Sequence, residues 1–173
     1  MAKKDIPKNN PEKVSKTKGL AIRPIESEDV KGAADLVARL KRLNGEFDPL
    51  LKTTVDVEDQ ALKSVKEALA NKDSILLVAA LNSKIVGVVK ADLIDRIFYE
   101  PRKEGSIIEF YVLPEFRRSN LGRDLTNAMI ERLKKKGAAL ITAEFPSQNE
   151  IAKGFYSKLG FRSITNVYAR AEL

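Results

Sequence analysis

The spacing of apolar residues changes from a helical to a strand period after residue 70, and that change limits the folds this chain can adopt. Between residues 30 and 70 apolar side chains recur every three or four positions. This predicts two amphipathic helices, the first fading near Asn44-Gly45 and the second covering 57–70. From Ile75 onward the apolar runs have strand length, and the turn Asn82-Ser83-Lys84 joins two of them as a hairpin. The sequence therefore predicts an α/β (α+β) fold.

The remaining patterns complete one order of strands and helices. Helical spacing returns at 121–133 and 149–159, and strand patterns cover 20–25, 75–81, 85–93, 107–113, 139–145 and 161–172. The resulting order is β-α-α-β-β-β-α-β-α-β, with no internal repeat. A length of 173 residues also favours one domain, which we place at 20–173.

The positive charge of the chain is concentrated at its N-terminus. The formal net charge is +7, and residues 1–19 hold six lysines against only Asp5 and Glu12. Since this segment has almost nothing to bury, we predict a disordered basic tail over 1–19. Its composition leaves two roles open: a solubilising extension, or an arm that contacts an acidic partner or nucleic acid. We expect no nucleic-acid binding elsewhere.

Two residue types are missing from the chain. It contains no cysteine and no histidine, which excludes disulfides, thiolate or imidazole metal sites, cysteine nucleophiles and histidine bases. Proton transfer must therefore use Asp, Glu, Tyr, Lys, a terminal amine or water, and we expect no metal. No apolar run approaches the roughly 18 residues of a membrane span. The N-terminus also lacks the apolar core of a secretory signal, so we expect a cytoplasmic protein with no membrane contact.

Residues 107–125 predict a strand, a short polar loop and a helix that begins near Leu121-Gly122. Free N–H groups at the start of a helix favour bound anions, and Arg117, Arg118 and Arg123 add positive charge there. The segment is compatible with a phosphate or pyrophosphate site. It is equally compatible with an ordinary polar loop before a helix.

Residues 149–161 predict a second short helix. Asn149 can cap its start, and Gly160 can end it before Phe161. Taken alone, Tyr156 is either a core aromatic residue or a catalytic group.

Taken together, these two segments resemble the GNAT N-acetyltransferase superfamily. The family motif V-x-P-x-x-[QR]-x-x-G-x-[GA] is matched from Val112 to Gly122, and the later motif N-x-x-A-x-x-F-Y-x-x-x-G-F is matched from Asn149 to Phe161. The resemblance covers the chain from about residue 20. It implies the family's mixed, mostly antiparallel central sheet flanked by helices. Asn120 replaces the first motif glycine; because Asn tolerates positive φ next after Gly, we expect the loop to survive, with the cofactor affinity or the loop path affected.

The resemblance implies that acetyl-CoA binds in a gap between the strands at 107–113 and 139–145. The backbone of 118–123 would hold the pyrophosphate, the pantetheine arm would pair with 110–112, and the N–H near Val112 would polarise the thioester carbonyl. The cofactor-binding residues implied in this way are Phe110, Tyr111, Val112, Arg117, Arg118, Ser119, Asn120, Leu121, Gly122, Arg123, Asn149, Ala152 and Tyr156.

The resemblance further implies direct transfer of the acetyl group to an amine, with Tyr156 as the general acid that protonates the leaving thiolate. Glu109 is the first candidate for the base, Glu144 on the neighbouring strand is the second, and a water chain is a third. By strand alternation Glu109 and Tyr111 share one face and Phe110 and Val112 the other, unless a bulge intervenes. Glu109 could equally be a paired or exposed strand carboxylate.

The acceptor amine would meet the connection between the first two helices. Glu46 and Asp48 could hold a cation and Phe47 could pack its stem, with Glu144 on the opposite side; alternatively this is an ordinary packed loop. The predicted function is transfer of acetyl from acetyl-CoA to a primary amine, on a protein lysine or N-terminus or on a small molecule. The alternative is an acyl-CoA-binding sensor or scaffold with weak or no turnover. The resemblance is compatible with a homodimer.

Overall fold

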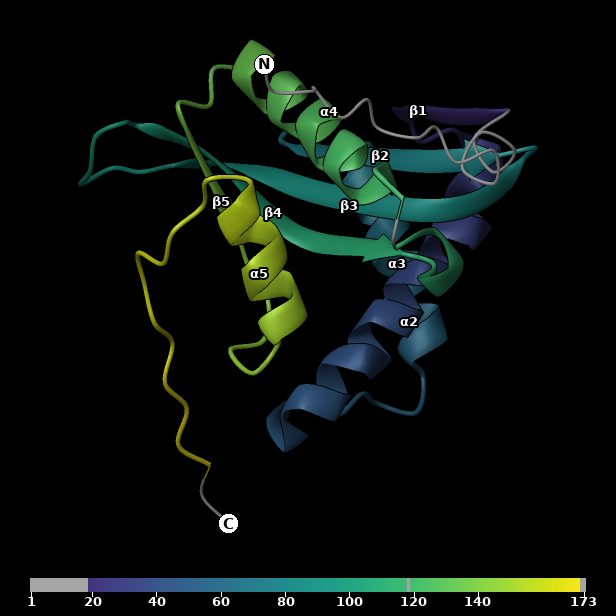
Figure 1. Cartoon of the computed structure of the whole chain (residues 1–173), viewed down its shortest axis with the longest axis horizontal. Coiled ribbons are helices and arrows are strands. Elements are labelled where there is room, and N and C mark those ends of the chain that lie inside the picture. The colour runs from purple at the N-terminus through teal and green to yellow at the C-terminus, as the bar shows by residue number, and fades with distance from the viewer. Residues whose placement is uncertain (1–18, 118, 172–173) are drawn as a thin grey trace, which may run out of the picture.

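The computed structural model describes residues 19–117 and 119–171, and a single five-stranded sheet organises them. The strands lie in the order β1-β2-β3-β4-β5 (Figure 1). Their bounds are β1 (Leu20–Pro24), β2 (Ser74–Leu81), β3 (Lys84–Asp95), β4 (Lys103–Val112) and β5 (Leu140–Ala143). All neighbours are antiparallel except β4 and β5, which are parallel. The predicted mixed, mostly antiparallel sheet is confirmed.

Helices cover both faces of the sheet (Figure 1). They are α2 (Val30–Phe47), α3 (Val57–Ala70), α4 (Leu121–Lys135) and α5 (Glu150–Lys158), with short 3-10 turns η1 (Ser27–Asp29), η2 (Pro49–Leu51) and η3 (Pro114–Phe116). Opposite side chains of β4 identify the two layers: Glu109 pairs with Lys41 of α2, whereas Phe110 stacks on Phe155 of α5. The central strands are therefore buried on both faces, and Val78, Val86, Val88 and Val89 are fully inaccessible.

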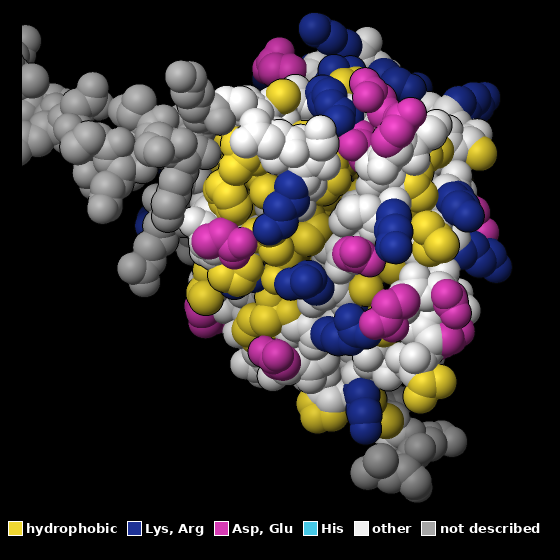
Figure 2. Space-filling model, turned by 90° about the vertical axis from the view of Figure 1, so that its right-hand side faces the viewer, with side chains coloured by type: hydrophobic (Ala, Val, Ile, Leu, Met, Phe, Trp, Pro, Cys, Tyr) yellow, Lys and Arg dark blue, Asp and Glu magenta, His cyan; other side chains and the backbone are white. Residues whose placement is uncertain are grey.

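The surface combines both signs of charge. On the face that lies to the right in Figure 1, Lys and Arg side chains alternate with Asp and Glu, and apolar side chains lie between them (Figure 2). A surface of this kind has no strong field of a single sign. None of the helices in 19–117 and 119–171 is long and apolar enough to cross a membrane.

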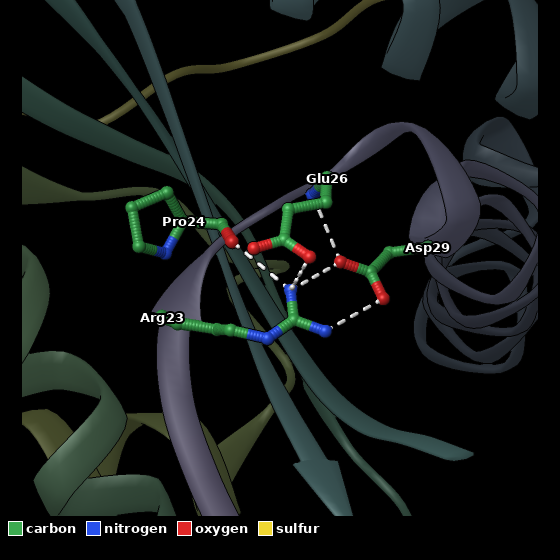
Figure 3. A network of polar contacts seen from close by, with 4 residues as sticks. All are labelled: Arg23, Pro24, Glu26 and Asp29. Atoms are coloured by element: carbon green, nitrogen blue, oxygen red, sulfur yellow. Dashed lines mark hydrogen bonds and ion pairs between the residues drawn. The ribbon is translucent and has the colours of Figure 1, made fainter. Parts of the chain in front are cut away.

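A partly buried ion pair joins β1 to the start of α2 (Figure 3). The Arg23 guanidinium donates to both carboxylate oxygens of Asp29, at 2.5 and 3.0 Å, and the Glu26 backbone N–H donates to the same carboxylate at 2.8 Å. The Asp29 side chain is only 6% exposed. These bonds hold the pKa of Asp29 below its usual value, chiefly through the hydrogen bond from Arg23 and against the opposing effect of burial.

Two sequence predictions need correction. Helix α2 does not fade at Asn44-Gly45 but continues to Phe47, where Asp48 turns to extended backbone (φ −152°, ψ 130°) before Pro49, as expected for a residue that precedes proline. The strand predicted over 161–172 is wrong for residues 161–171, which have no regular secondary structure and no strand beside them to pair with. The predicted tail lies outside the described residues except for Gly19.

Candidate active site

Strands β4 and β5 run together for only four residue pairs and then separate. Their register pairs Glu104 to Ile107 with Leu140 to Ala143. The bond from the Glu144 N–H to the Ile107 carbonyl, at 2.9 Å, is the last between them within the described part of the chain. Beyond it β4 continues to Val112 while pairing only with β3. The second half of β4 thus has one edge that faces no strand.

A β-bulge at Ile108 lies where the two strands separate. Opposite β3, Lys90 pairs with Glu109 and Ala91 with Ile107, so Ile108 is an extra residue in β4. A bulge bends its strand and increases the local twist, which accounts for the separation from β5. The bulge also explains why Glu109 faces α2. The Cβ direction of Gly105, four residues earlier in the same strand, points at Leu133 of α4, and without the bulge Glu109 would share that face. The predicted shared face of Glu109 and Tyr111 holds, because the bulge precedes both.

The free edge of β4 offers backbone donors. The Leu113 N–H donates to Val86 of β3 at 3.0 Å. Because successive N–H groups of a strand point to opposite edges, the N–H groups of Val112 and Phe110 point away from β3. The Arg117 Nε donates to the Val112 carbonyl at 3.0 Å, and the guanidinium lies 5.2 Å from the Tyr111 ring centroid. Arg117 therefore occupies the Val112 carbonyl on this edge, and the Val112 N–H remains available to a ligand.

A cleft of about 360 Å³, part of it open to solvent, lies in the gap between β4 and β5. Four elements contribute its walls, which are mostly apolar. The lining residues are Leu40 and Asn44 of α2, Ile108 and Phe110 of β4, Glu144, Phe145 and Pro146 after β5, and Asn149, Ala152 and Tyr156 of α5 and its cap.

Tyr156 is the most enclosed aromatic residue of this cleft. Its side chain is 4% exposed, and four phenylalanine rings surround it with centroids 5.1 to 6.3 Å away: Phe110, Phe145, Phe155 and Phe161. Burial raises the pKa of the Tyr156 hydroxyl well above its ordinary value near 10. The phenol consequently stays protonated at neutral pH and can act as a proton donor.

Asn149 caps the helix that carries Tyr156. Its Oδ1 accepts from the Ala152 N–H at 3.0 Å, as the sequence predicted for this cap. The amide oxygen is committed to the helix, so the amide NH₂ is the group that Asn149 can offer to a ligand in the cleft.

On the other face of β4, Glu109 is 5% exposed and its Oε1 lies 3.0 Å from the Lys41 Nζ. The second carboxylate oxygen, Oε2, is buried without a hydrogen-bond partner among the described residues, and so is the Asn44 Oδ1 in the cleft wall. Unpartnered buried acceptors are uncommon, and they fit a donor such as an amine or a water molecule.

Comparison with known proteins decides the family. The model of the acetyltransferase (GNAT) family matches residues 39–161, which include the open edge of β4 and the cleft. The chain belongs to the GNAT family. An uncharacterized N-acetyltransferase of Methanocaldococcus jannaschii is 36% identical over 84 residues, which cover 49% of this chain and 37% of that protein.

Other GNAT proteins extend the comparison. The ribosomal protein bS18-alanine N-acetyltransferase of Escherichia coli is 34% identical over 62 residues, covering 36% of this chain and 42% of that protein. The chain thus matches less than half the length of both curated relatives. The crystal structure of a predicted acetyltransferase with acetyl-CoA from Clostridium acetobutylicum has a TM-score of 0.72 and 16% identity, and covers 88% of this chain and 96% of that one. This match supports the fold.

Acetyl-CoA, which the GNAT family uses, fits the residues present. The separation of β4 from β5 leaves the N–H groups of Phe110 and Val112 on an open edge beside the cleft. The start of α4 adds N–H groups without intrahelical partners, and its Leu121 N–H is held by Ser119 Oγ at 3.2 Å. A Cβ on Gly122 would make ordinary contacts of 3.5 Å with Phe110 and Phe155, so the start of the helix lies beside the aromatic residues of the cleft. Arg123 is exposed, and Arg118 lies outside the described residues.

The Asn120 substitution in the GNAT motif is tolerated for a reason other than the one expected. Asn120 has φ −75° and ψ 0°, an ordinary helical conformation, so this position does not need the positive φ that glycine or asparagine would favour. Asn120 therefore adopts its conformation in this loop without backbone strain.

The predicted acceptor residues of this GNAT chain are only partly brought together. Glu144 lines the cleft and accepts from the Ser106 hydroxyl at 3.4 Å. Glu46 is exposed, and the Asp48 carboxylate caps η2 by accepting from the Leu50 N–H at 2.8 Å. From α2 the cleft receives Leu40 and Asn44 instead of Glu46, Phe47 and Asp48. Sequence reasoning missed Lys41 and Asn44, although their helical spacing from Val37 and Leu40 placed them on the sheet side of α2.

Proposed function

We propose that this chain catalyses transfer of an acetyl group from acetyl-CoA directly to a primary amine. The single observation that carries the proposal is the open edge of β4, with its free Val112 N–H, beside a cleft that contains a buried, protonated tyrosine. When bound, acetyl-CoA supplies the thioester that the amine attacks. The new bond joins the amine nitrogen to the acetyl carbon, and the bond from that carbon to sulfur breaks.

The chain's own groups have separate tasks in this proposal. The Val112 N–H donates to the carbonyl oxygen, where negative charge develops. The Tyr156 hydroxyl gives its proton to the departing sulfur as the bond from carbon to sulfur breaks, and the resulting phenolate takes a proton back from water. Phe110, Phe145 and Phe155 pack around the Tyr156 ring and hold it in the cleft.

The acceptor ammonium must lose a proton before it attacks, since its pKa is about 10. We assign this proton to Glu109, directly or through a water, because its Oε2 is buried and without a hydrogen-bond partner among the residues described. Lys41 holds the other oxygen of the same carboxylate, which fixes the direction of Oε2. Glu144 at the cleft wall is the second candidate.

Replacement of Tyr156 by phenylalanine tests the general acid. We expect Y156F to lower kcat about 10²- to 10⁴-fold, a typical general-acid contribution, while CoA affinity stays within about twofold because the ring packing is kept. Release of free thiol, measured with acetyl-CoA and a panel of amines, gives the rate. Calorimetry with CoA gives the affinity.

Tyr99 provides the matched control. It lies on the loop between β3 and β4, is 66% exposed and does not line the cleft, so Y99F should keep wild-type turnover. Equal turnover of Y156F and Y99F would reject Tyr156 as the acid. CoA binding without thiol release for any amine of the panel would instead favour an acyl-CoA sensor.

A further inference from the structure

Hydrogen-bond donors and acceptors at the cleft come from different walls. The donors are the N–H groups on the free edge of β4, the Asn149 amide NH₂ and the Tyr156 hydroxyl. The side of α2 offers an acceptor instead: the Asn44 Oδ1 is buried and has no hydrogen-bond partner within residues 19–117 and 119–171, and the same is true of the Glu109 Oε2 on β4. The donor side suits the carbonyl oxygen of a thioester, whereas the acceptor side suits a group that carries several N–H bonds.

Lys41 connects these two acceptors. Its Nζ lies 3.0 Å from the Glu109 Oε1, and Asn44 is three residues further along the same helix, so the Lys41 and Asn44 side chains are neighbours on one face of α2. Leu40, the residue before Lys41, lines the cleft together with Asn44. Because Lys41 occupies Oε1, the oxygen of Glu109 that is left for a ligand is Oε2.

Two neighbouring buried acceptors without a donor are uncommon in a folded protein. An ammonium nitrogen carries three N–H donors and a positive charge, so a single ammonium group can serve both acceptors and also balance the carboxylate. A hydroxyl group brings only one donor and no charge. The pair of acceptors therefore favours an amine over an alcohol.

We propose that Asn44 binds the acceptor amine, whose ammonium group donates one N–H to the Asn44 Oδ1 and another to the Glu109 Oε2. This inference rests on the function proposed above. The N–H that meets Glu109 gives its proton to the carboxylate, which leaves a lone pair for the acetyl carbon. The N–H that meets Asn44 is kept, because an amide oxygen is a very weak base, and it fixes the direction of the lone pair. After the bond to carbon has formed, the nitrogen releases one further proton to water.

A series of methylated ammonium ions counts the N–H groups that this site recognises. Methylammonium, dimethylammonium, trimethylammonium and tetramethylammonium have the same charge but three, two, one and no N–H groups. With CoA present, NMR titration of each ion measures its affinity without any chemical step. We expect the wild type to bind trimethylammonium about tenfold more weakly than dimethylammonium, the effect of one lost hydrogen bond to a charged group. Asn44→Leu, which has a similar shape, should bind both ions equally.

Turnover gives a second measurement of the role of Asn44. Asn44→Leu should lower kcat/KM for the amines of the panel about 10- to 100-fold, while the affinity for CoA stays within about twofold. Asn44→Asp keeps an oxygen at this position, so we expect a KM close to that of wild type; kcat should fall because the added negative charge holds the proton on the amine. Asn127→Leu, at an exposed position of α4 that does not line the cleft, is the matched control and should leave both constants unchanged.

The two measurements distinguish a failure of this inference from a failure of the proposed function. Equal binding of dimethylammonium and trimethylammonium by the wild type, or an undiminished difference in Asn44→Leu, overturns the role of Asn44. Loss of the difference in Glu144→Gln alone would place the amine at the opposite wall and reject Asn44 as well. If no amine of the panel releases thiol, the proposed function is wrong, and the affinity series still decides whether Asn44 binds an ammonium group.

Discussion

At the scale of single residues, Tyr156 and Asp29 show opposite outcomes of burial. Tyr156 is surrounded by phenylalanine rings, and removal of water alone raises the pKa of its hydroxyl. Asp29 is nearly as buried, but the Arg23 guanidinium and the Glu26 N–H stabilise its charged form more than burial opposes it, so its pKa falls. The same fold thus keeps Tyr156 neutral in the cleft and keeps Asp29 ionised where β1 meets α2.

Asp29 makes stability depend on pH in a defined direction. Because its pKa is lowered in the folded state, its contribution is complete above the unfolded value of about 4 and is lost as pH falls further. We expect the difference in unfolding free energy between wild type and Asp29→Asn to be constant from about pH 5 to 7 and to shrink below pH 4. Urea unfolding at each pH measures it. For Glu67→Gln, in an exposed pair with Lys63, the difference should stay close to zero; a flat profile for Asp29→Asn would contradict the assignment.

Substitution of Arg23 tests how much the other partner of this ion pair contributes to stability. Its replacement by methionine leaves the Asp29 carboxylate with only the Glu26 N–H as donor. We expect a loss of about 1–3 kcal/mol in unfolding free energy at pH 7, the penalty for a buried group that loses its partner. The loss should be much smaller at pH 3, where Asp29 is closer to neutral. Equal losses at both pH values would mean that Arg23 acts through packing alone.

At the scale of elements, α4 packs tightly against β4 at Gly105. A Cβ added there would lie 2.7 Å from a methyl carbon of Leu133, which is completely buried. The helix that begins at the cofactor loop is therefore seated directly on the strand that provides the open edge. This contact seats the C-terminal half of α4 on the first half of β4.

Two Gly→Ala substitutions, one at this contact and one at an open position, distinguish the steric effect of the contact from the usual effect of replacing glycine. Gly105→Ala should destabilise the protein by about 1–3 kcal/mol, because the overpacked Leu133 has no free space. Gly154→Ala, at an exposed position of α5 with no atom within 4 Å of the added Cβ, should stabilise it by about 0.5–1 kcal/mol. Thermal and urea unfolding measure both. A neutral Gly105→Ala would show that α4 can shift away from β4.

The elements also show which features a single sequence can predict. Apolar runs predicted β2, β3 and β4, and the motif spacing led to Asn149, Ala152 and Tyr156, which do line one cleft. The bulge at Ile108 could not be predicted, because it arises from the register between two strands. The same is true of the ion pair between Lys41 and Glu109, which joins residues far apart in the chain. The pattern at 161–172 predicted a strand from residue preference alone, but a strand also requires hydrogen bonds to a neighbouring strand, and residues 162–171 form none with the other described residues.

At the scale of the whole molecule, ligand binding and stability are linked. A ligand that binds only the folded state adds about 2.7 kcal/mol at a concentration of 100 times its Kd. For a chain of this length that corresponds to a rise in Tm of about 5–10 °C. Strands β4 and β5 pair over fewer residues than the other neighbouring strands of the sheet. We therefore expect ligand binding to stabilise this part of the fold most.

Gly122→Ala should weaken ligand binding without lowering the stability of the fold. The added Cβ would make ordinary contacts of 3.5 Å with Phe110 and Phe155, so the Tm without ligand should be equal to or slightly above that of wild type. The methyl group occupies space at the start of α4, where phosphate groups would approach the backbone. We therefore expect a smaller rise in Tm with CoA, measured by differential scanning calorimetry. An unchanged rise would place the phosphates elsewhere.

Ile108 is an extra residue in β4, with no partner in the register with β3. Deleting it would leave Ile107 and Glu109 opposite the same residues of β3 and every later side chain on its present face. The straightened strand could then continue alongside β5 and close the opening. Such a protein would have the same core and connectivity but no room for a ligand. In evolutionary terms, the opening depends on the length of one strand, so a single-codon deletion could abolish binding while every other residue that lines the cleft is kept.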